Sequence, residues 1–269
     1  MKDTLEEWLA EDIGKGDFTS ESVISNGSCN AHIRGGPGTL SGIDLVHKLL
    51  NKMKIEFKTD FSDGDIVSEN TLIYELEGKA HDIMKSERLI LNILSHFSGV
   101  ASLTAKIVKL AKKSNPNIEI LATRKTIPGI REFSKKAVVH GGGMTHRLRL
   151  DDAILIKDNH LKLSGSIADA VQKSKNRHPN LTVEVEADNL IQALEVANSG
   201  ADRLMLDNFT PSEVSEAVSQ IRQISDIEIE VSGGINSTNI VDYAPYPDFI
   251  SMSSLTMSAP PVDFSLHVI

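Results

Sequence analysis

The chain has 269 residues, of which 40% are hydrophobic and 24% charged, which is typical of a globular protein with a full apolar core. Its one cysteine, Cys29, excludes an internal disulfide and a cysteine-rich zinc site. The formal net charge of −9 argues against a nucleic-acid-binding surface.

The start of the chain and its hydropathy predict a cytoplasmic protein. The first residues, MKDTLEEWLAED, are acidic and contain no uninterrupted apolar stretch, so they do not resemble a signal peptide. No run approaches the roughly 20 apolar residues that cross a bilayer. We therefore expect neither a membrane nor a nucleic acid among the partners.

The first part of the chain, residues 1–108, predicts an α+β domain. Glycines punctuate its short apolar runs, and a strongly amphipathic stretch follows, ending near Gly99. The expected elements are a short N-terminal helix, strands around 28–36 and 71–80, and helices over 82–97 and 100–113.

The remainder, residues 109–269, predicts an open α/β barrel of about six parallel strands. Short apolar runs alternate with helical patterns, which is typical of βαβ units. The runs are 118–122, 153–156, 182–186, 203–207, 227–231 and 248–252, and the helical patterns are 166–177, 189–200 and 212–223. The C-terminal tail is free to pack back on the first domain.

The segment from Leu121 to His160 is basic although the chain is acidic. It has eight Lys or Arg residues against four Asp or Glu, so it carries +4 and the rest of the chain −13. A solvated basic surface would explain this cluster, and so would a pocket for a small polyanion. Because the charges follow strands and lie beside glycines, we favour the pocket. We expect changes at Lys135 or Lys136 to matter much less than changes at Arg124 or Lys157, if these two lysines are solvated.

Polar residues follow every expected strand of the barrel, where active sites of such folds lie. In chain order they are 123-TRKT-126, 157-KDNH-160, Glu186, 207-DN-208, 232-SGG-234, and the group Ser253, Ser254 and Thr256. If these were ordinary polar loops, only one or two of the strands would be followed by such residues. Because all the expected strands are, we predict that the residues form one site at this rim.

The residue types at this rim have complementary chemistry. Arg124, Lys125, Arg147 and Lys157 can grip carboxylates or phosphates. Glu184 and Glu186 alternate with valines, so both face the barrel interior. Glu186 and Asp207 can then hold Mg²⁺ or ribose hydroxyls, whereas Glu184 lies deeper and is expected to be structural.

Two further features are weaker signals. The turn Ser232-Gly233-Gly234 offers backbone N–H groups to a phosphate, although a tight turn explains two glycines equally well. His146 beside Arg147 could be an acid, a base, an anion donor or simply structural. No zinc spacing, Walker loop or nucleophile motif is present.

The sequence resembles the quinolinate phosphoribosyltransferase family over nearly its whole length. The resemblance rests on the central string ATRKTIPGIREFSKKAVVHGGGMTHRLRLDDAILIKDNH and on shorter strings. These lie at 122–160, 11–20, 87–104, 182–186, 203–208 and 231–235. The ATRKT and GGG-x-x-HRL strings, with APP-x-D near the C-terminus, also resemble a paralogous family linked to molybdenum transport.

The resemblance implies a homodimer with shared active sites, or a higher oligomer, and a role for each motif residue. Arg88 would serve the neighbouring subunit's site. Quinolinate would be bound by Arg124, Lys125, His146, Arg147 and Lys157. Glu186 and Asp207 would face the ribose and Mg²⁺ of phosphoribosyl pyrophosphate, with Lys125 and Lys157 as the other catalytic residues. Ser232, Gly233, Gly234 and Ser253 would hold the 5′-phosphate.

The implied activity is that of a pentosyltransferase in NAD biosynthesis. It converts quinolinate and phosphoribosyl pyrophosphate into nicotinate mononucleotide, pyrophosphate and CO₂. The family usually has other residues at Ala122, Thr145, Arg149, Ser253 and Met257. Two alternatives therefore stay open: a paralogous transferase for another heteroaromatic acid, and a catalytically silent anion-binding protein.

Overall fold

The computed structural model describes residues 4–269, and the chain divides into two compact units. One contains the residues up to Leu103 together with the tail Ala259–Ile269, and the other is Thr104–Ser258. The sequence predicts a boundary after residue 108. In the structure the division falls inside helix α4 (Ala80–Ser114), which is continuous where two helices were expected.

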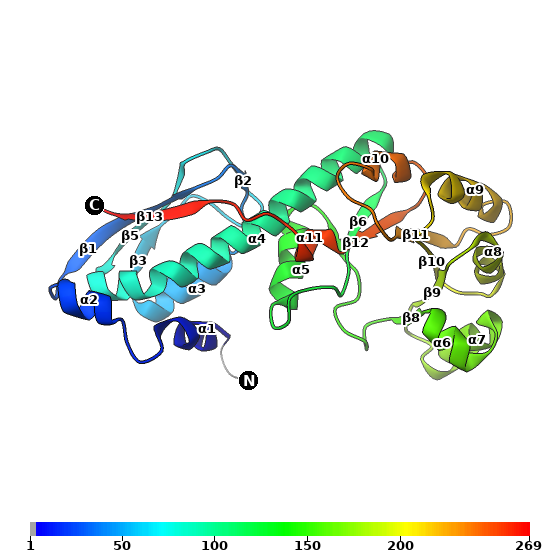
Figure 1. Ribbon diagram of the computed structural model, residues 1–269, viewed down its shortest axis with the longest axis horizontal. Helices are drawn as coiled ribbons and strands as arrows, with labels where there is room; N and C mark the ends of the chain where they lie inside the picture. The colour runs from blue at the N-terminus through cyan, green and yellow to red at the C-terminus, as the bar shows by residue number, and fades with distance from the viewer. Residues whose placement is uncertain (1–3) are drawn as a thin grey trace. The chain divides into compact units, whose positions relative to one another are not determined.

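The first unit is built on an antiparallel sheet with the order β13-β1-β5-β3. Alternation in β1 buries Ala31 and Ile33, which are fully covered. The tail strand β13 runs beside β1 (Figure 1). The strands are β1 (Ser28–Gly35), β3 (Glu56–Lys58), β5 (Thr71–Lys79) and β13 (Phe264–Val268).

Three helices and a small second sheet complete the first unit beside its share of α4. Helix α3 is the most amphipathic of them and buries Ile43, Val46, Leu49 and Leu50. The elements are α1 (Thr4–Ile13), α2 (Phe18–Val23), α3 (Ile43–Met53), β2 (Gly38–Thr39) and β4 (Ile66–Val67). The α+β organisation expected from the sequence is confirmed.

Gly99 lies inside α4 and does not end it, contrary to the sequence-based expectation. A Cβ at this position would lie 2.3 Å from the carbonyl oxygen of Pro260 and 3.1 Å from Cα of Pro261. The glycine is therefore explained by the close approach of the tail, because no side chain fits between the helix and these backbone atoms.

The second unit is a parallel sheet of seven strands in the order β7-β6-β12-β11-β10-β9-β8. Within the described residues no ladder joins β7 to β8, so the barrel is open, as predicted. The six expected runs are confirmed as β6 (Glu119–Ala122), β8 (Ile154–Ile156), β9 (Val183–Ala187), β10 (Arg203–Asp207), β11 (Glu228–Ser232) and β12 (Phe249–Met252). The seventh strand, β7 (Met144–Thr145), is too short to leave an apolar run.

The helices of this unit begin and end where local signals place them. The side chain of Thr210 accepts the backbone N–H of Glu213 in a capping box, and Pro211 opens the first turn of α9. Gly200, with φ of +81°, follows the end of α8. The helices are α5 (Arg131–His140), α6 (Asp158–Ser164), α7 (Ile167–Arg177), α8 (Leu190–Asn198), α9 (Pro211–Ile221), α10 (Ile240–Tyr243) and α11 (Ser254–Met257).

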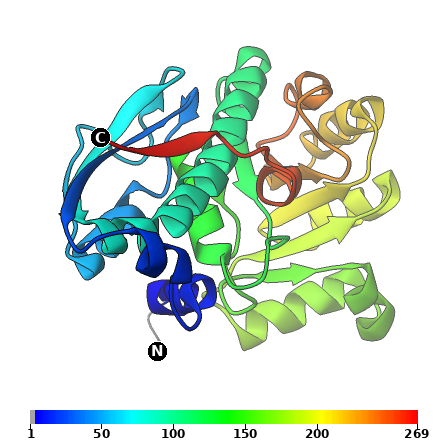
Figure 2. The same ribbon diagram turned by 60° about the vertical axis from the view of Figure 1, so that its left-hand side comes forward.

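The core of the second unit lies between these strands and helices. Figure 2 shows the strands, coloured green to orange, with helices along one side of the sheet. Helix α9 buries Val214, Ala217, Val218 and Ile221, which recur at helical spacing. No helix within residues 4–269 is both long and apolar enough to cross a membrane.

Replacing Gly99 with Ala should lower the stability of the first unit. A Gly-to-Ala change inside a helix normally adds about 0.5–1 kcal/mol of stability. Here the new methyl group would meet the backbone of Pro260 and Pro261, so the tail or the helix must shift. We expect the free energy of unfolding in urea to fall by about 1–3 kcal/mol. An increase would show that the tail does not pack on this helix.

Candidate active site

A cavity of about 310 Å³ opens at the carboxyl ends of the parallel strands of the second unit. Each of the seven strands contributes to it, either from its end or from the loop that follows. Its lining consists of Thr123, Arg124, Lys125, His146, Arg147, Leu155, Lys157, Glu186, Met205, Asp207, Glu230, Ser232 and Ser251. Eight of the residues predicted for the site therefore lie together.

Cations form one side of the cavity. Arg124 and Arg147 come from the ends of the adjacent strands β6 and β7, and Nε of Arg124 is buried without a hydrogen-bond partner. Burial, and then the nearby guanidinium of Arg124, lowers the pKa of Arg147. Two cations that repel one another beside an unused donor favour the binding of an anion.

The loop that carries Arg147 is held by its own backbone contacts. Nη1 of Arg147 donates to the carbonyl oxygen of Ala153 at 3.4 Å. The carboxylate of Asp152 accepts the backbone N–H groups of Leu148 and Arg149 at 2.6 and 3.0 Å. These two hydrogen bonds lower the pKa of Asp152. Contacts within the chain thus hold the loop in place.

Carboxylates form the other side of the cavity. Oxygens of Glu186, Asp188 and Asp207 lie within 4.8 Å of one another. Glu186 is paired with the ammonium of Lys157, and Asn208 Nδ2 donates to Asp207 Oδ2 at 2.7 Å. Burial, and then the charge of Glu186, raises the pKa of Asp207. This side therefore suits a cation or a group that develops positive charge.

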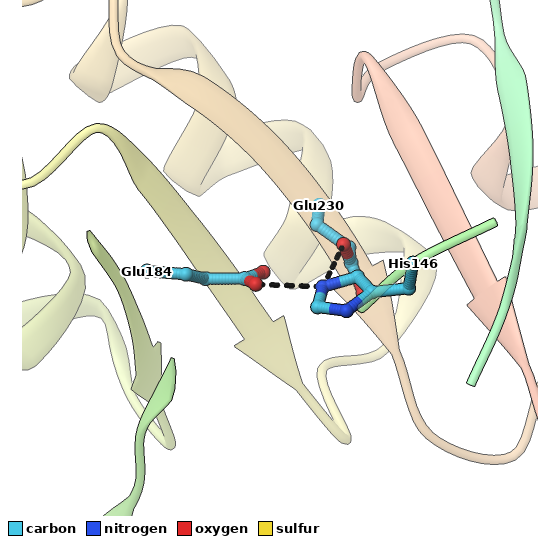
Figure 3. A group of neighbouring side chains, drawn as sticks. All are labelled: His146, Glu184 and Glu230. Atoms are coloured by element: carbon cyan, nitrogen blue, oxygen red, sulfur yellow. Dashed lines mark hydrogen bonds and ion pairs between the residues drawn. The ribbon is translucent and has the colours of Figure 1, made fainter. Parts of the chain in front are cut away.

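A cluster of His146, Glu184 and Glu230 lies at the bottom of the cavity, where His146 and Glu230 contribute to its lining (Figure 3). His146 Nδ1 accepts the backbone N–H of Arg147 at 2.8 Å, so a neutral ring carries its proton on Nε2. His146 Nε2 then donates to Glu184 Oε2 at 2.7 Å and lies 3.5 Å from Glu230 Oε2. The two carboxyl groups thereby fix the ring orientation of the histidine.

The carboxyl groups of this cluster hold their protons more tightly than ordinary ones. Glu184 and Glu230 are 3% and 0% exposed, and burial raises their pKa values to about 7 and about 8. Arg203 supports them from one side, with Nη1 3.7 Å from Glu230 Oε2 and its guanidinium over the ring of Phe249 at 4.0 Å.

Glu230 is a site residue that the sequence analysis missed. A usable signal was present, because Glu228 and Glu230 alternate with the buried Ile229 and Val231 in β11. The same alternation that turns Glu184 inward on β9 therefore turns Glu230 inward on β11.

The predicted phosphate turn is only partly in the cavity. Ser232 lines it, whereas Gly233, Gly234 and Ser253 do not. Gly233 has φ of +97°, and a Cβ there would lie 2.3 Å from Oδ1 of Asn208. Asn208 also donates its backbone N–H to the Ser232 carbonyl oxygen at 2.9 Å. The turn is therefore tightly fixed, and only glycine fits at its second position.

Lys135 is not solvated, so the condition for a small effect does not hold at this position. Its side chain is 1% exposed, because it projects from α5 beneath the ends of β6 and β7 and donates to three backbone carbonyls. Lys136 is exposed, and its ammonium lies 3.1 Å from the carboxylate of Glu132. The helical period accounts for the difference between neighbours: Lys135 shares the buried face with Ser134 and Val138.

Comparison with known proteins identifies the family of this chain. Models of the N-terminal and C-terminal domains of quinolinate phosphoribosyl transferase match residues 17–98 and 100–267. The chain belongs to the quinolinate phosphoribosyltransferase family.

Family members from distant organisms match along almost their whole length. A probable carboxylating nicotinate-nucleotide pyrophosphorylase of Methanocaldococcus jannaschii is 41% identical over 98% of this chain and 96% of its own. The carboxylating nicotinate-nucleotide pyrophosphorylase of Homo sapiens is 32% identical over 98% of this chain and 90% of its own. The solved structure of the Francisella tularensis nicotinate-nucleotide pyrophosphorylase superposes with a TM-score of 0.93 at 39% identity, covering 98% of this chain and 94% of that one.

Replacing Glu230 with Gln should change how stability depends on pH. The folded protein retains a proton on Glu230 that the unfolded chain loses above the ordinary pKa of 4.5. This contribution to stability is full below about pH 4.5 and disappears as the pH rises through about 8. Gln keeps the shape and cannot ionise, so the variant should gain on the order of 1 kcal/mol relative to the wild type between about pH 7 and 8.5. Parallel stability curves from urea unfolding would show that Glu230 does not hold the proton.

Proposed function

We propose that this chain catalyses the transfer of the phosphoribosyl group of phosphoribosyl pyrophosphate to the ring nitrogen of quinolinate. Loss of CO₂ then gives nicotinate mononucleotide, with pyrophosphate as the other product. The observation that carries the proposal is the division of one cavity into a cationic side, with Arg124 and Arg147, and an anionic side, with Glu186 and Asp207. Family membership supplies the identity of the two substrates.

The cationic side fits a dicarboxylate. Quinolinate carries two adjacent carboxylates, and each needs a partner when it leaves water. Arg124 offers a buried donor without a partner, while Arg147 and Lys125 line the same side. His146, fixed by Glu184, borders this group at the bottom of the cavity. In this proposal these residues orient the ring so that its nitrogen faces the sugar.

The anionic side fits the sugar. As pyrophosphate leaves, the anomeric carbon gains positive charge in an oxocarbenium-like transition state, which nearby carboxylates stabilise. Glu186 and Asp207 lie on neighbouring strands, and both line the cavity. The ion pair with Lys157 holds the Glu186 carboxylate in place. Lys125 and Lys157 also line the cavity, and in this proposal they interact with the anionic groups of the substrates.

We propose Mg²⁺ as the cofactor. The carboxylate oxygens of Glu186, Asp188 and Asp207 are hard donors within 4.8 Å of one another, and this donor set fits the ion. Glu186 and Asp207 would hold it together with substrate oxygens. When bound, Mg²⁺ neutralises the charge of the departing pyrophosphate.

The turn after β11 is the proposed position of the 5′-phosphate. Gly233 and Gly234 both have positive φ, +97° and +65°, and such turns direct successive backbone N–H groups toward an anion. Ser232 lies at its edge, and Ser253 follows the neighbouring strand β12. In this proposal the hydroxyl of Ser253 adds a donor to the same phosphate.

Decarboxylation follows from the charge that transfer creates. Once the ring nitrogen bonds to the sugar it is cationic, so the adjacent ring carbon can retain the electron pair of the breaking bond to CO₂. A proton then takes the place of the lost carboxylate. The cations Arg124 and Arg147 hold the substrate carboxylates during this step and, by excluding water, favour a charge that is spread over the ring.

We further propose a cytoplasmic homodimer in which Arg88 completes the site of the other subunit. Arg88 is exposed on α4 in the first unit and is absent from the lining of the cavity in the second. An exposed cation within an amphipathic helix is available to a partner. A higher oligomer built from such dimers is compatible with this arrangement.

The purified protein should release CO₂ from quinolinate only when phosphoribosyl pyrophosphate and Mg²⁺ are both present. Nicotinate has one carboxylate and would leave part of the cationic side unpaired, so it should be a poor acceptor. Release of labelled CO₂ measured beside nicotinate mononucleotide formation tests both points, and a chelator should stop the reaction. Turnover of another aromatic acid instead of quinolinate would indicate the paralogous transferase. Binding without any turnover would indicate a silent anion-binding protein.

Mixing two inactive variants should test the shared site. Arg88→Ala and Lys157→Ala each remove one cation from every site of their homodimers. A hybrid dimer has one site with both residues intact if Arg88 acts across the interface. A random mixture should therefore recover about a quarter of wild-type activity, as expected for exchange within a two-fold dimer. Mass spectrometry would show that subunit exchange has occurred. If activity still does not recover, Arg88 lies in its own subunit's site or outside any site.

A further inference from the structure

Lys135 lies beneath the cationic side of the cavity and does not line it. It belongs to helix α5, and its ammonium donates to the carbonyl oxygens of Ala122 at 2.9 Å, His146 at 2.8 Å and Arg147 at 2.7 Å. An ammonium group has three donors, so these three bonds use all of them.

The three acceptors belong to the two segments that carry the arginines. Ala122 ends β6, two residues before Arg124, and His146 and Arg147 directly follow β7. The backbone N–H of His146 also donates to the carbonyl oxygen of Ala122 at 3.3 Å. Lys135 therefore joins both strand ends. It fixes the distance between the backbone positions from which the side chains of Arg124 and Arg147 project.

Stability alone is a poor explanation for this lysine. Burial, and then the charge of Arg131, lowers the pKa of Lys135 to about 8, so the fold holds the cation at a cost. The nearby arginines Arg124 and Arg147 act in the same direction, and Asp152 opposes them. No carboxylate is among its hydrogen-bond partners, and an apolar side chain in a buried position is often as stable or more so.

We infer that Lys135 is a positioning residue for the dicarboxylate substrate: it aligns Arg124 and Arg147 and adds positive charge behind them. The inference rests on the proposed function for the identity of that substrate. The ammonium reaches the substrate only through these residues and does not touch it. The three hydrogen bonds of Lys135 go to neither Glu186 nor Asp207. Those two carboxylates are held separately, through Lys157 and Asn208.

This separation gives a test that a general structural role would not pass. Loss of Lys135 should weaken binding of the dicarboxylate and leave binding of phosphoribosyl pyrophosphate almost unchanged. A residue that merely stabilises the fold would affect both substrates together. Lys136 offers a matched control, because it is the next residue of the same helix and is exposed beside Glu132.

The experiment compares Lys135→Met and Lys136→Met in the intact protein. Phthalate serves as the probe for binding, since it has the two adjacent carboxylates and no ring nitrogen to react. In Lys135→Met we expect its dissociation constant and the KM of quinolinate to rise about ten-fold or more, as for other supporting residues. The KM of phosphoribosyl pyrophosphate should change less than about two-fold, and Lys136→Met should match the wild type.

Several outcomes would overturn the inference. These are equal rises in both KM values, unchanged phthalate affinity in Lys135→Met, or equal effects from the two lysines. If Lys135→Met does not fold, Lys135→Gln, which keeps two donors without the charge, should show the same selective loss, and an unselective one would count against the inference. A wild type that binds phthalate but does not turn over quinolinate would contradict the proposed function and leave the phthalate comparison to decide on Lys135. A wild type that binds no phthalate would contradict both.

Discussion

Burial of one face of each parallel strand determines which side chains point toward the active site. In β9, Val183, Val185 and Ala187 are fully covered, so the intervening Glu184 and Glu186 must face the barrel interior. The same rule applies to Glu230 in β11. The apolar core thus places carboxyl groups in positions that are unfavourable for a polar side chain. Neighbouring residues offset part of this cost by pairing with them.

Charge is accommodated differently at each depth of the barrel. At the rim, Glu186 is paired with Lys157 and lines the cavity. One layer below, Glu184 is hydrogen-bonded to His146 and holds its proton to a higher pH than an ordinary carboxyl group. In this lower layer one oxygen of Glu184 and both oxygens of Glu230 are buried without a hydrogen-bond partner, although Glu230 Oε2 lies 3.5 Å from His146 Nε2. Depth in the barrel therefore distinguishes the carboxyl groups that orient other side chains from the carboxyl groups that face the cavity at its rim.

Local patterns in the sequence were sufficient to predict most of the barrel, because its strands and helices repeat with clear periods. Alternation identified Glu186, and the residues at and after the strand ends identified Asp207 and the cations. Two features escaped because they depend on distant segments. Lys135 finds its acceptors 11 to 13 residues away, and two of them follow β7, a two-residue strand that leaves no pattern. Gly99 is explained only by Pro260, far along the chain.

The tail that meets Gly99 also gives the molecule an unusual order of assembly. Strand β1 pairs with β5 on one side and with β13 on the other, and β13 begins at Phe264. The whole barrel, Thr104–Ser258, is therefore an insertion within the first unit. During synthesis on the ribosome, the edge of β1 stays open until these last residues emerge, whereas every strand of the barrel is already available. Translation thus delivers the barrel as an uninterrupted segment and completes the sheet of the first unit only afterwards.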